Sequence, residues 1–315
     1  MQFRHDGPGR IIKPDGSPVT LADFGAQALV VRELRRELGD PHIVGEESPG
    51  FLRSHEGGPA VEQVVLALEA SGAWPGAEPG AVLEAIEGGA HRTDGGGDGF
   101  WTLDPIDGTR GFLRGEQYSV CLAYIRGGRP IVGAVACPNL SAEFDRPYSH
   151  PDPHGVICFG WQAGGAWTVP ADAPGDSPRS VTRPPWRPGD RVRLTESVSS
   201  GHSNREAFTR LMEALVPPAT PVRIDSQCKY VVVARGEADA YLRVPPRADH
   251  AENIWDHAPG ALLLEETGCT VTDLRGRSLD FSKPKITGAF GIVGATPTLH
   301  AKLVQLAAEL NIVPQ

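Results

Sequence analysis

Residues 100–109, FWTLDPIDGT, constrain the fold and the chemistry of this chain more than any other stretch. The apolar start predicts a buried strand, and the proline and glycine that follow predict a tight turn at its end. Asp104 and Asp107 are therefore expected close together at a strand end. Two like charges held that close repel each other, so the arrangement is favourable only with a cation between them or with one carboxyl protonated.

Mg²⁺ is the cation that this motif favours, because its ligands are hard oxygens and no cysteine or histidine is nearby. Residues 109–115 add a hydroxyl, two guanidinium groups and two glycines, all of which suit a phosphate. The motif thus predicts a metal-assisted phosphate site. The alternative is a Pro-Gly turn whose aspartates only cap and solvate it, since turns are rich in these residues for local reasons.

The composition excludes several classes of protein. The chain has 315 residues, enough for one large or two medium lobes, and it has neither a long apolar stretch nor a hydrophobic signal core, so we expect a cytoplasmic protein with no membrane partner. Five cysteines without CxxC spacing argue against a zinc site and a disulfide framework. A net charge of -9 argues against a nucleic-acid polymer, but a bound metal would still allow a small anionic substrate.

Four further carboxylates stand where a strand ends or a helix begins. Asp23 falls in the first turn of a helix capped by Thr20, where it could simply complement the helix dipole. Glu46 and Glu47 follow a short strand near residue 43, as in a second acidic strand end or a common surface turn. Asp256 begins an apolar, buried helix, either as a cap or as a third metal carboxylate.

Hydrophobic periodicity and turn residues predict the other elements. Helices are expected at 21–34, 60–70, 79–87, 204–215, 226–235, 256–267 and 298–310. Hairpins are expected at 118–137 and 155–169, and strands at 191–195, 221–225, 239–244, 269–273 and 291–295. After a loose lead-in at 1–16, we expect an N-terminal α+β lobe (1–169) with most metal ligands, a linker (170–189) and a C-terminal α/β lobe (190–315) with Asp256.

The acidic stretches GEE at 45–47, DPIDGT at 104–109 and WDHAPG at 255–260, in this order, resemble the inositol monophosphatase superfamily of Mg²⁺-dependent, lithium-sensitive phosphatases. The resemblance covers nearly the whole chain and implies a layered αβαβα sandwich of the inositol monophosphatase/fructose-1,6-bisphosphatase type. Five further stretches are similar to the 3′(2′),5′-bisphosphate nucleotidases of that superfamily: residues 100–103, 111–118, 199–203, 225–230 and 241–245.

The resemblance implies a phosphomonoesterase that removes the 3′-phosphate of adenosine 3′,5′-bisphosphate, with 3′-phosphoadenosine 5′-phosphosulfate as a further candidate substrate. It implies that two or three Mg²⁺ ions are held by Glu46, Asp104, the carbonyl of Ile106, Asp107 and Asp256. Asp23 and Thr109 would hydrogen-bond to each other and, with Glu46, position the attacking water. The residues implied to face the substrate are Gly108, Thr109, His202, Ser226, Lys229 and Arg243.

Two alternatives stay open at this point. A related phosphatase for inositol polyphosphates or sugar bisphosphates would differ in whether His202, Lys229 and Arg243 bind adenosine 5′-phosphate. A catalytically silent sensor of nucleotides or cations belongs to a different class. The protein is expected as a monomer or homodimer. Asn253 departs from the resemblance, which leads us to expect a lysine there.

Overall fold

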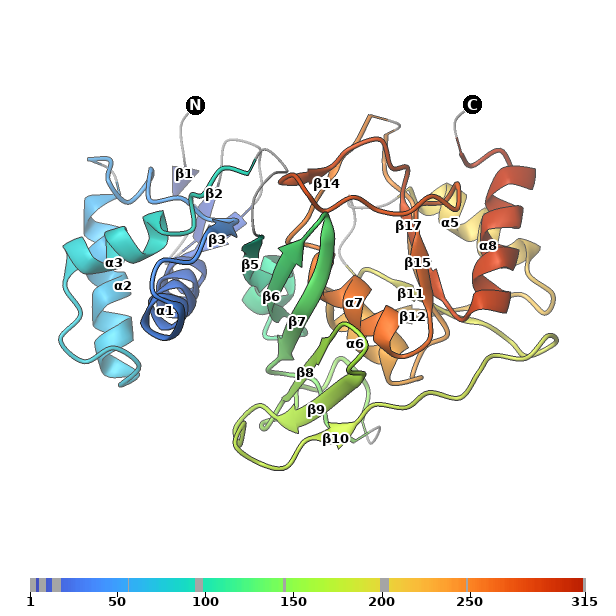
Figure 1. Ribbon diagram of the computed structural model, residues 1–315, viewed down its shortest axis with the longest axis horizontal. Helices are drawn as coiled ribbons and strands as arrows, with labels where there is room; N and C mark the ends of the chain where they lie inside the picture. The colour runs from blue at the N-terminus through green and yellow to red at the C-terminus, as the bar shows by residue number, and fades with distance from the viewer. Residues whose placement is uncertain are drawn as a thin grey trace.

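Two β-sheets with helices between them and on both outer sides form the frame of the molecule (Figure 1). The computed structural model describes residues 4–5, 10–12, 18–55, 57–93, 99–143, 146–198, 204–247 and 249–313. The successive layers are helix, sheet, helix, sheet, helix, which confirms the predicted αβαβα sandwich.

The larger sheet has seven strands in the order β10-β9-β8-β7-β6-β5-β4. Its neighbours are antiparallel except for the parallel pair β4 and β5. The two predicted hairpins are confirmed as β6 with β7 and β8 with β9. The strands are β4 (Ile43–Gly45), β5 (Phe100–Asp107), β6 (Ser119–Arg126), β7 (Arg129–Cys137), β8 (Val156–Trp161), β9 (Ala166–Pro170) and β10 (Arg179–Ser180).

The first helical layer contains α1 (Leu21–Leu38), α2 (Gly58–Ala70) and α3 (Pro79–Glu87) beside a small sheet. That sheet comprises β1 (Arg4–His5), β2 (Arg10–Ile12) and β3 (Pro18–Thr20), so the prediction of a loose lead-in at 1–16 is wrong for two short segments. Burial explains the difference, because Ile11 pairs with Val19 and both side chains are fully buried.

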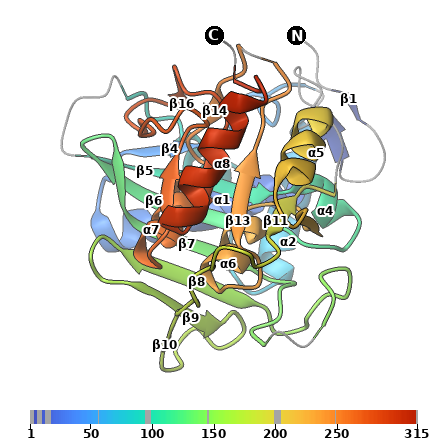
Figure 2. The ribbon, with the colours of Figure 1, turned by 90° about the vertical axis from the view of Figure 1, so that its right-hand side faces the viewer.

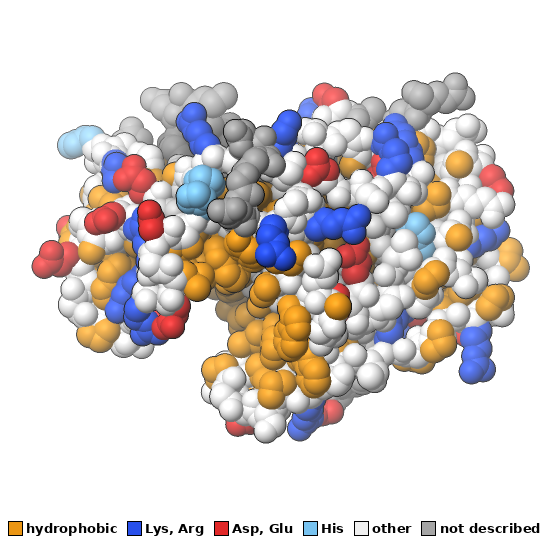
Figure 3. Space-filling view, viewed as in Figure 1, with side chains coloured by type: hydrophobic (Ala, Val, Ile, Leu, Met, Phe, Trp, Pro, Cys, Tyr) orange, Lys and Arg blue, Asp and Glu red, His pale blue; other side chains and the backbone are white. Residues whose placement is uncertain are grey.

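Helix α1 covers only one end of the outer face of the large sheet. Val31 packs there against Ile43 and Leu103. Farther along the same face, by strand register, Val132 and Trp161 lie opposite each other and are 39% and 47% exposed. Figure 3 shows a hollow beside the first helical layer in which hydrophobic side chains gather.

The inner helices α6 (Cys228–Ala234) and α7 (Ala258–Glu266) pack between the two sheets. The second sheet has the order β12-β11-β13-β17-β15, and α5 (Arg205–Ala214) and α8 (Pro297–Glu309) cover its outer face (Figure 2). Its strands are β11 (Arg193–Glu196), β12 (Thr220–Arg223), β13 (Ala240–Arg243), β15 (Thr270–Thr272) and β17 (Ile292–Ala295).

Three short elements complete the site region: α4 (Thr109–Leu113), β14 (Glu252–Asn253) and β16 (Lys285–Ile286). Strands β14 and β16 form a two-stranded antiparallel sheet of their own. The chain passes from the larger sheet to the second sheet between β10 and β11, at residues 181–192, and the segment expected as a linker, 170–189, contains β10. In the described part of the chain, no helix is both long and apolar enough to cross a membrane.

Candidate metal centre and phosphate site

Asp104 and Asp107 both lie on β5, which continues through Pro105 to Asp107 instead of ending before the proline. Asp104 pairs with Cys121 and Asp107 pairs with Ser119, so three steps along β5 match two steps along β6. Residues three apart on a regular strand point to opposite faces, and one extra residue brings them to the same face. The bulge therefore brings the two carboxylates together.

A third carboxylate reaches the same place from the second half of the chain. Carboxylate oxygens of Asp104, Asp107 and Asp256 all lie within 4.8 Å of one another. Burial, followed by the nearby charges of Glu46, Asp107 and Asp256, raises the pKa of Asp104 well above its ordinary value. Without a cation, this cluster retains protons that free carboxyl groups would lose.

The carboxyl groups of Asp107 and Asp256 also have raised pKa values, to different degrees. Burial raises the pKa of Asp107 to about 6, although the Lys229 ammonium and the backbone N–H of Gln227 both favour its ionised form. Burial and then the charge of Asp107 raise the pKa of Asp256 to about 8. At neutral pH a smaller fraction of each group is therefore ionised than of an exposed aspartate. A bound cation would favour the ionised forms and so lower both pKa values.

Glu46 stands directly after β4, beside Asp104. The backbone of the next residue, Glu47, is held by Gln27, a buried residue of α1 that the sequence did not single out. The Gln27 amide donates to the carbonyl oxygens of Glu47 (2.6 Å) and Ile86 (3.0 Å), and its oxygen accepts from the Glu47 N–H (3.0 Å). A buried glutamine on the inner side of an amphipathic helix is the signal that could have indicated this role.

Gln227 joins the carboxylates from the two halves of the chain and was also missed. Its backbone N–H donates to Oδ2 of Asp107, and its side-chain Nε2 donates to the carbonyl of Trp255 (2.8 Å), the residue before Asp256. Its Oε1 accepts from the N–H of Gly260 at the start of α7 (3.2 Å). Gln227 thus fixes the relative positions of β5, α6 and the segment that carries Asp256.

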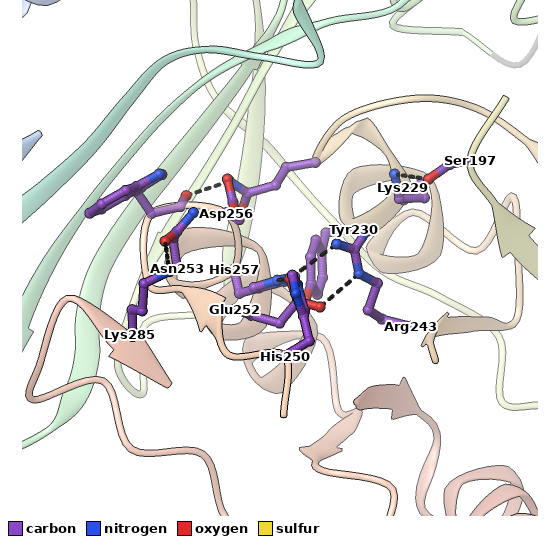
Figure 4. A network of polar contacts seen from close by, with 12 residues as sticks. Ser197, Lys229, Tyr230, Arg243, His250, Glu252, Asn253, Asp256, His257 and Lys285 are labelled. Carbon is purple, nitrogen blue, oxygen red and sulfur yellow. Dashed lines mark hydrogen bonds and ion pairs between the residues drawn. The ribbon is translucent and has the colours of Figure 1, made fainter. Parts of the chain in front are cut away.

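The described residues among those expected to face the substrate lie near this acidic cluster. Gly108 has φ +85° and packs against Ser226, which has φ +64°. Lys229 is buried and donates to Oγ of Ser197, at 3.1 Å (Figure 4). It lies close enough to Asp107 and Arg243 to interact electrostatically with both. Its burial lowers the pKa of the ammonium, while Asp107 favours the charged form.

Arg243 is held by a residue that the sequence did not single out, Glu252 of β14. Nε and Nη2 of Arg243 donate to the two carboxylate oxygens of Glu252, at 2.9 and 3.0 Å. Although burial alone would raise the pKa of Glu252, the Arg243 guanidinium holds it well below its usual range. His257 lies 3.4 Å from Glu252 through Nε2, and its Nδ1 is 2.9 Å from the Tyr230 hydroxyl (Figure 4).

Two expectations about the water-positioning residues have different outcomes. The capping box of Thr20 and Asp23 is confirmed, with the Thr20 N–H and hydroxyl donating to Asp23 at 2.7 and 2.6 Å. The Asp23–Thr109 hydrogen bond that the resemblance implies stays a prediction, and in the structure the hydroxyl of Thr109 donates to the Ile106 carbonyl, at 3.3 Å. Thr109 begins α4, which contacts β3 just before Asp23. His202 lies outside the described residues.

The residues present fit a hard divalent cation. Several carboxylates converge in a largely buried place where each raises the pKa of another, and such a group needs a compensating positive charge to ionise. Glu252, Asp256 and His257 also come within 4.8 Å of one another. That second group is already compensated, because Glu252 is paired with Arg243.

Comparisons with known proteins agree with this arrangement. The family model described as "Inositol monophosphatase family" matches residues 13–311. The chain is 36% identical over 311 residues to a Schizosaccharomyces pombe protein named 3′(2′),5′-bisphosphate nucleotidase, covering 96% of this chain and 87% of that protein. It is 38% identical over 309 residues to an Arabidopsis thaliana protein named 3′,5′-bisphosphate nucleotidase 2, covering 94% and 87%.

Solved structures share the fold at lower sequence identity. The Thermotoga maritima IMPase matches with a TM-score of 0.60 and 19% identity over 93% of this chain and 84% of that one. An IMPase/NADP phosphatase solved with Mg²⁺ and phosphate matches with a TM-score of 0.58 and 15% identity over 94% and 85%. The family model, the relatives and the five-layered fold thus agree that the chain belongs to the inositol monophosphatase family.

Proposed function

We propose that this protein is a Mg²⁺-dependent phosphomonoesterase that releases the 3′-phosphate of adenosine 3′,5′-bisphosphate. One observation carries the proposal: the acidic cluster of β5 and Asp256 lies beside the Lys229–Arg243 pair. A substrate with two phosphates suits such a site, because one phosphate needs a metal at the carboxylates and the other needs fixed cations. The nucleotidase names of the relatives support this choice.

The residues proposed to hold two or three Mg²⁺ ions are Glu46, Asp104, the Ile106 carbonyl, Asp107 and Asp256. When bound, Mg²⁺ neutralises phosphate charge and makes a water more acidic. Glu46, with Asp23 and Thr109 on the neighbouring α1 and α4, orients the attacking water. A new bond forms between the water oxygen and phosphorus while the ester bond to the ribose 3′-oxygen breaks. The water loses a proton and the ribose 3′-oxygen gains one, which gives adenosine 5′-phosphate and inorganic phosphate.

The proposed binding of the second phosphate belongs to Ser226, Lys229 and Arg243, with His202 and the backbone at Gly108 and Thr109 completing the substrate contacts. Glu252 occupies Nε and Nη2 of Arg243, so the outer N–H groups of the guanidinium stay available to an anion. Ser197 accepts one hydrogen bond from Nζ of Lys229 and so holds the ammonium in place. Cations that are held by the protein before substrate arrives lose little side-chain entropy on binding.

Phosphate release is the experiment that tests this function. The substrates are adenosine 3′,5′-bisphosphate, 3′-phosphoadenosine 5′-phosphosulfate, inositol 1-phosphate, inositol 1,4-bisphosphate and fructose 1,6-bisphosphate, each with Mg²⁺ and with EDTA. We expect Mg²⁺-dependent release from the adenosine nucleotides. Release from an inositol or sugar phosphate alone would reassign the substrate class, and no release from any of them would support a nucleotide- or cation-binding sensor instead.

A further inference from the structure

Asp256 is contacted by a chain of two side chains from the small sheet of β14 and β16. Asn253 and Lys285 are paired across this antiparallel sheet. Nζ of Lys285 donates to Oδ1 of Asn253 at 3.1 Å, and Nδ2 of Asn253 donates to Oδ2 of Asp256 at 3.1 Å. Figure 4 shows the three residues in this order, on the side of Asp256 away from Arg243.

The direction of these hydrogen bonds is fixed by chemistry. A lysine ammonium has only donors and an ionised carboxylate has only acceptors, whereas the asparagine amide has one end of each kind. With Lys285 at one end and Asp256 at the other, only one orientation of the amide satisfies both neighbours. Lys285, although exposed, therefore reinforces the orientation in which Asn253 donates to Asp256.

The hydrogen bond from Asn253 leaves the two carboxylate oxygens of Asp256 in different environments. One oxygen of Asp256 accepts from Asn253, and in the described part of the chain its other oxygen, Oδ1, has no hydrogen bond. A carboxylate held at one oxygen has a restricted rotation and offers the other oxygen in a defined direction. Outer partners that orient ligands in this way strengthen metal binding.

We propose that Asn253 and Lys285 are positioning residues that orient Asp256 for a divalent cation. This inference rests on the proposed function, because it takes Asp256 as a metal ligand. Backbone contacts hold the segment independently: β14 pairs with β16, and the N–H of Ile254 donates to the Pro284 carbonyl at 3.1 Å. The two side chains are therefore expected to affect metal affinity more than folding.

Calorimetric titration of the full chain with Mg²⁺ alone tests this proposal. The variants are Asn253→Leu, Lys285→Met and the double variant, with Lys285→Arg as the conservative replacement. Lys283→Met is the matched control, because Lys283 is an exposed lysine of the same segment. Asp107→Asn reports separately on the site itself.

We expect Asn253→Leu and Lys285→Met each to weaken Mg²⁺ binding roughly tenfold. The double variant should be little weaker than Asn253→Leu, since Lys285 acts through Asn253. Lys285→Arg should retain most of the affinity, and Lys283→Met should match the unmodified protein. The melting temperature without Mg²⁺ should change little in all of them.

Several results would overturn the proposal. Asn253→Leu and Lys285→Met could bind Mg²⁺ normally while Asp107→Asn loses affinity. That result would support the metal site but exclude a contribution of Asn253 and Lys285 to it. Fully multiplicative losses in the double variant would rule out a chain acting through Asn253. A lower melting temperature with unchanged Mg²⁺ affinity would make both residues structural, and absence of Mg²⁺ binding in the unmodified protein would remove the site as well.

Discussion

Gly108 and Ser226, 118 residues apart in sequence, approach so closely that a Cβ on Gly108 would lie 2.8 Å from the Cβ of Ser226. Both residues have positive φ, +85° and +64°. The contact joins the end of β5 to the segment before α6, directly beside the hydrogen bond from Gln227 to Asp107. The proposed metal-binding and substrate-binding segments can thus approach this closely because residue 108 is a glycine and has no Cβ.

Gly108→Ala should therefore lower both stability and activity. A left-handed backbone costs an ordinary residue about 1 to 2 kcal/mol, and the overlap with Ser226 adds about 1 to 3 kcal/mol. Gly115→Ala is the matched control, because Gly115 has φ +68° and open space around its Cβ position. Urea unfolding and phosphate release check both variants, and equal losses of activity would contradict the importance of the contact.

Asp107→Asn should abolish turnover with the fold intact. The amide oxygen can still accept from Gln227, but the ligand charge is lost. We expect kcat to fall by at least about 100-fold, since even partners outside a ligand set cost about 10- to 100-fold in affinity or activity. Asp172→Asn, at an exposed carboxylate, is the control. Near-normal turnover of Asp107→Asn would refute the proposed metal site.

Lys229→Met should discriminate between substrates with and without a 5′-phosphate. Methionine keeps the apolar stem but removes a charge-assisted hydrogen bond, which contributes about 1.5 to 3 kcal/mol. Relative to adenosine 3′-phosphate, kcat/KM for the bisphosphate should fall roughly 10- to 100-fold. Lys302→Met, on the exposed side of α8, should change neither value. Equal losses for the two substrates would place Lys229 outside the 5′-phosphate site.

Mg²⁺ should stabilise the protein more at pH 8.5 than at pH 6. In the metal-free protein the pKa of Asp107 is raised to about 6 and that of Asp256 to about 8. Between pH values of about 4 and 8, these two carboxyl groups therefore bind more protons in the folded protein than in the unfolded chain. The free energy of unfolding consequently falls as the pH rises. A bound cation removes this loss because it favours the ionised carboxylates.

Melting temperatures with and without Mg²⁺ at both pH values check this dependence. The increase caused by Mg²⁺ should be larger at the higher pH, and Asp107→Asn should show a much smaller increase at either pH. An increase that is the same at both pH values in the unmodified protein would mean that protons and Mg²⁺ do not compete at these carboxylates.

Local patterns predicted most of the elements. Helical periodicity placed α2 and α3 within two residues of their observed ends, and Gly127 and Gly128 marked the hairpin of β6 and β7. The acidic motifs likewise predicted a cation at Asp104 and Asp107, and the structure brings these two and Asp256 together. These features are readable from sequence because each depends on residues close together in the chain.

The tertiary structure alone decided how the motifs combine. The bulge in β5 turns Asp104 and Asp107 to one face, although their spacing on a regular strand would separate them. Gln227 connects Asp107 to the segment of Asp256, Glu252 fixes Arg243, and Lys285 orients Asn253. Such contacts arise from how distant strands and helices stack, and no local pattern in the chain specifies which buried polar side chains will meet.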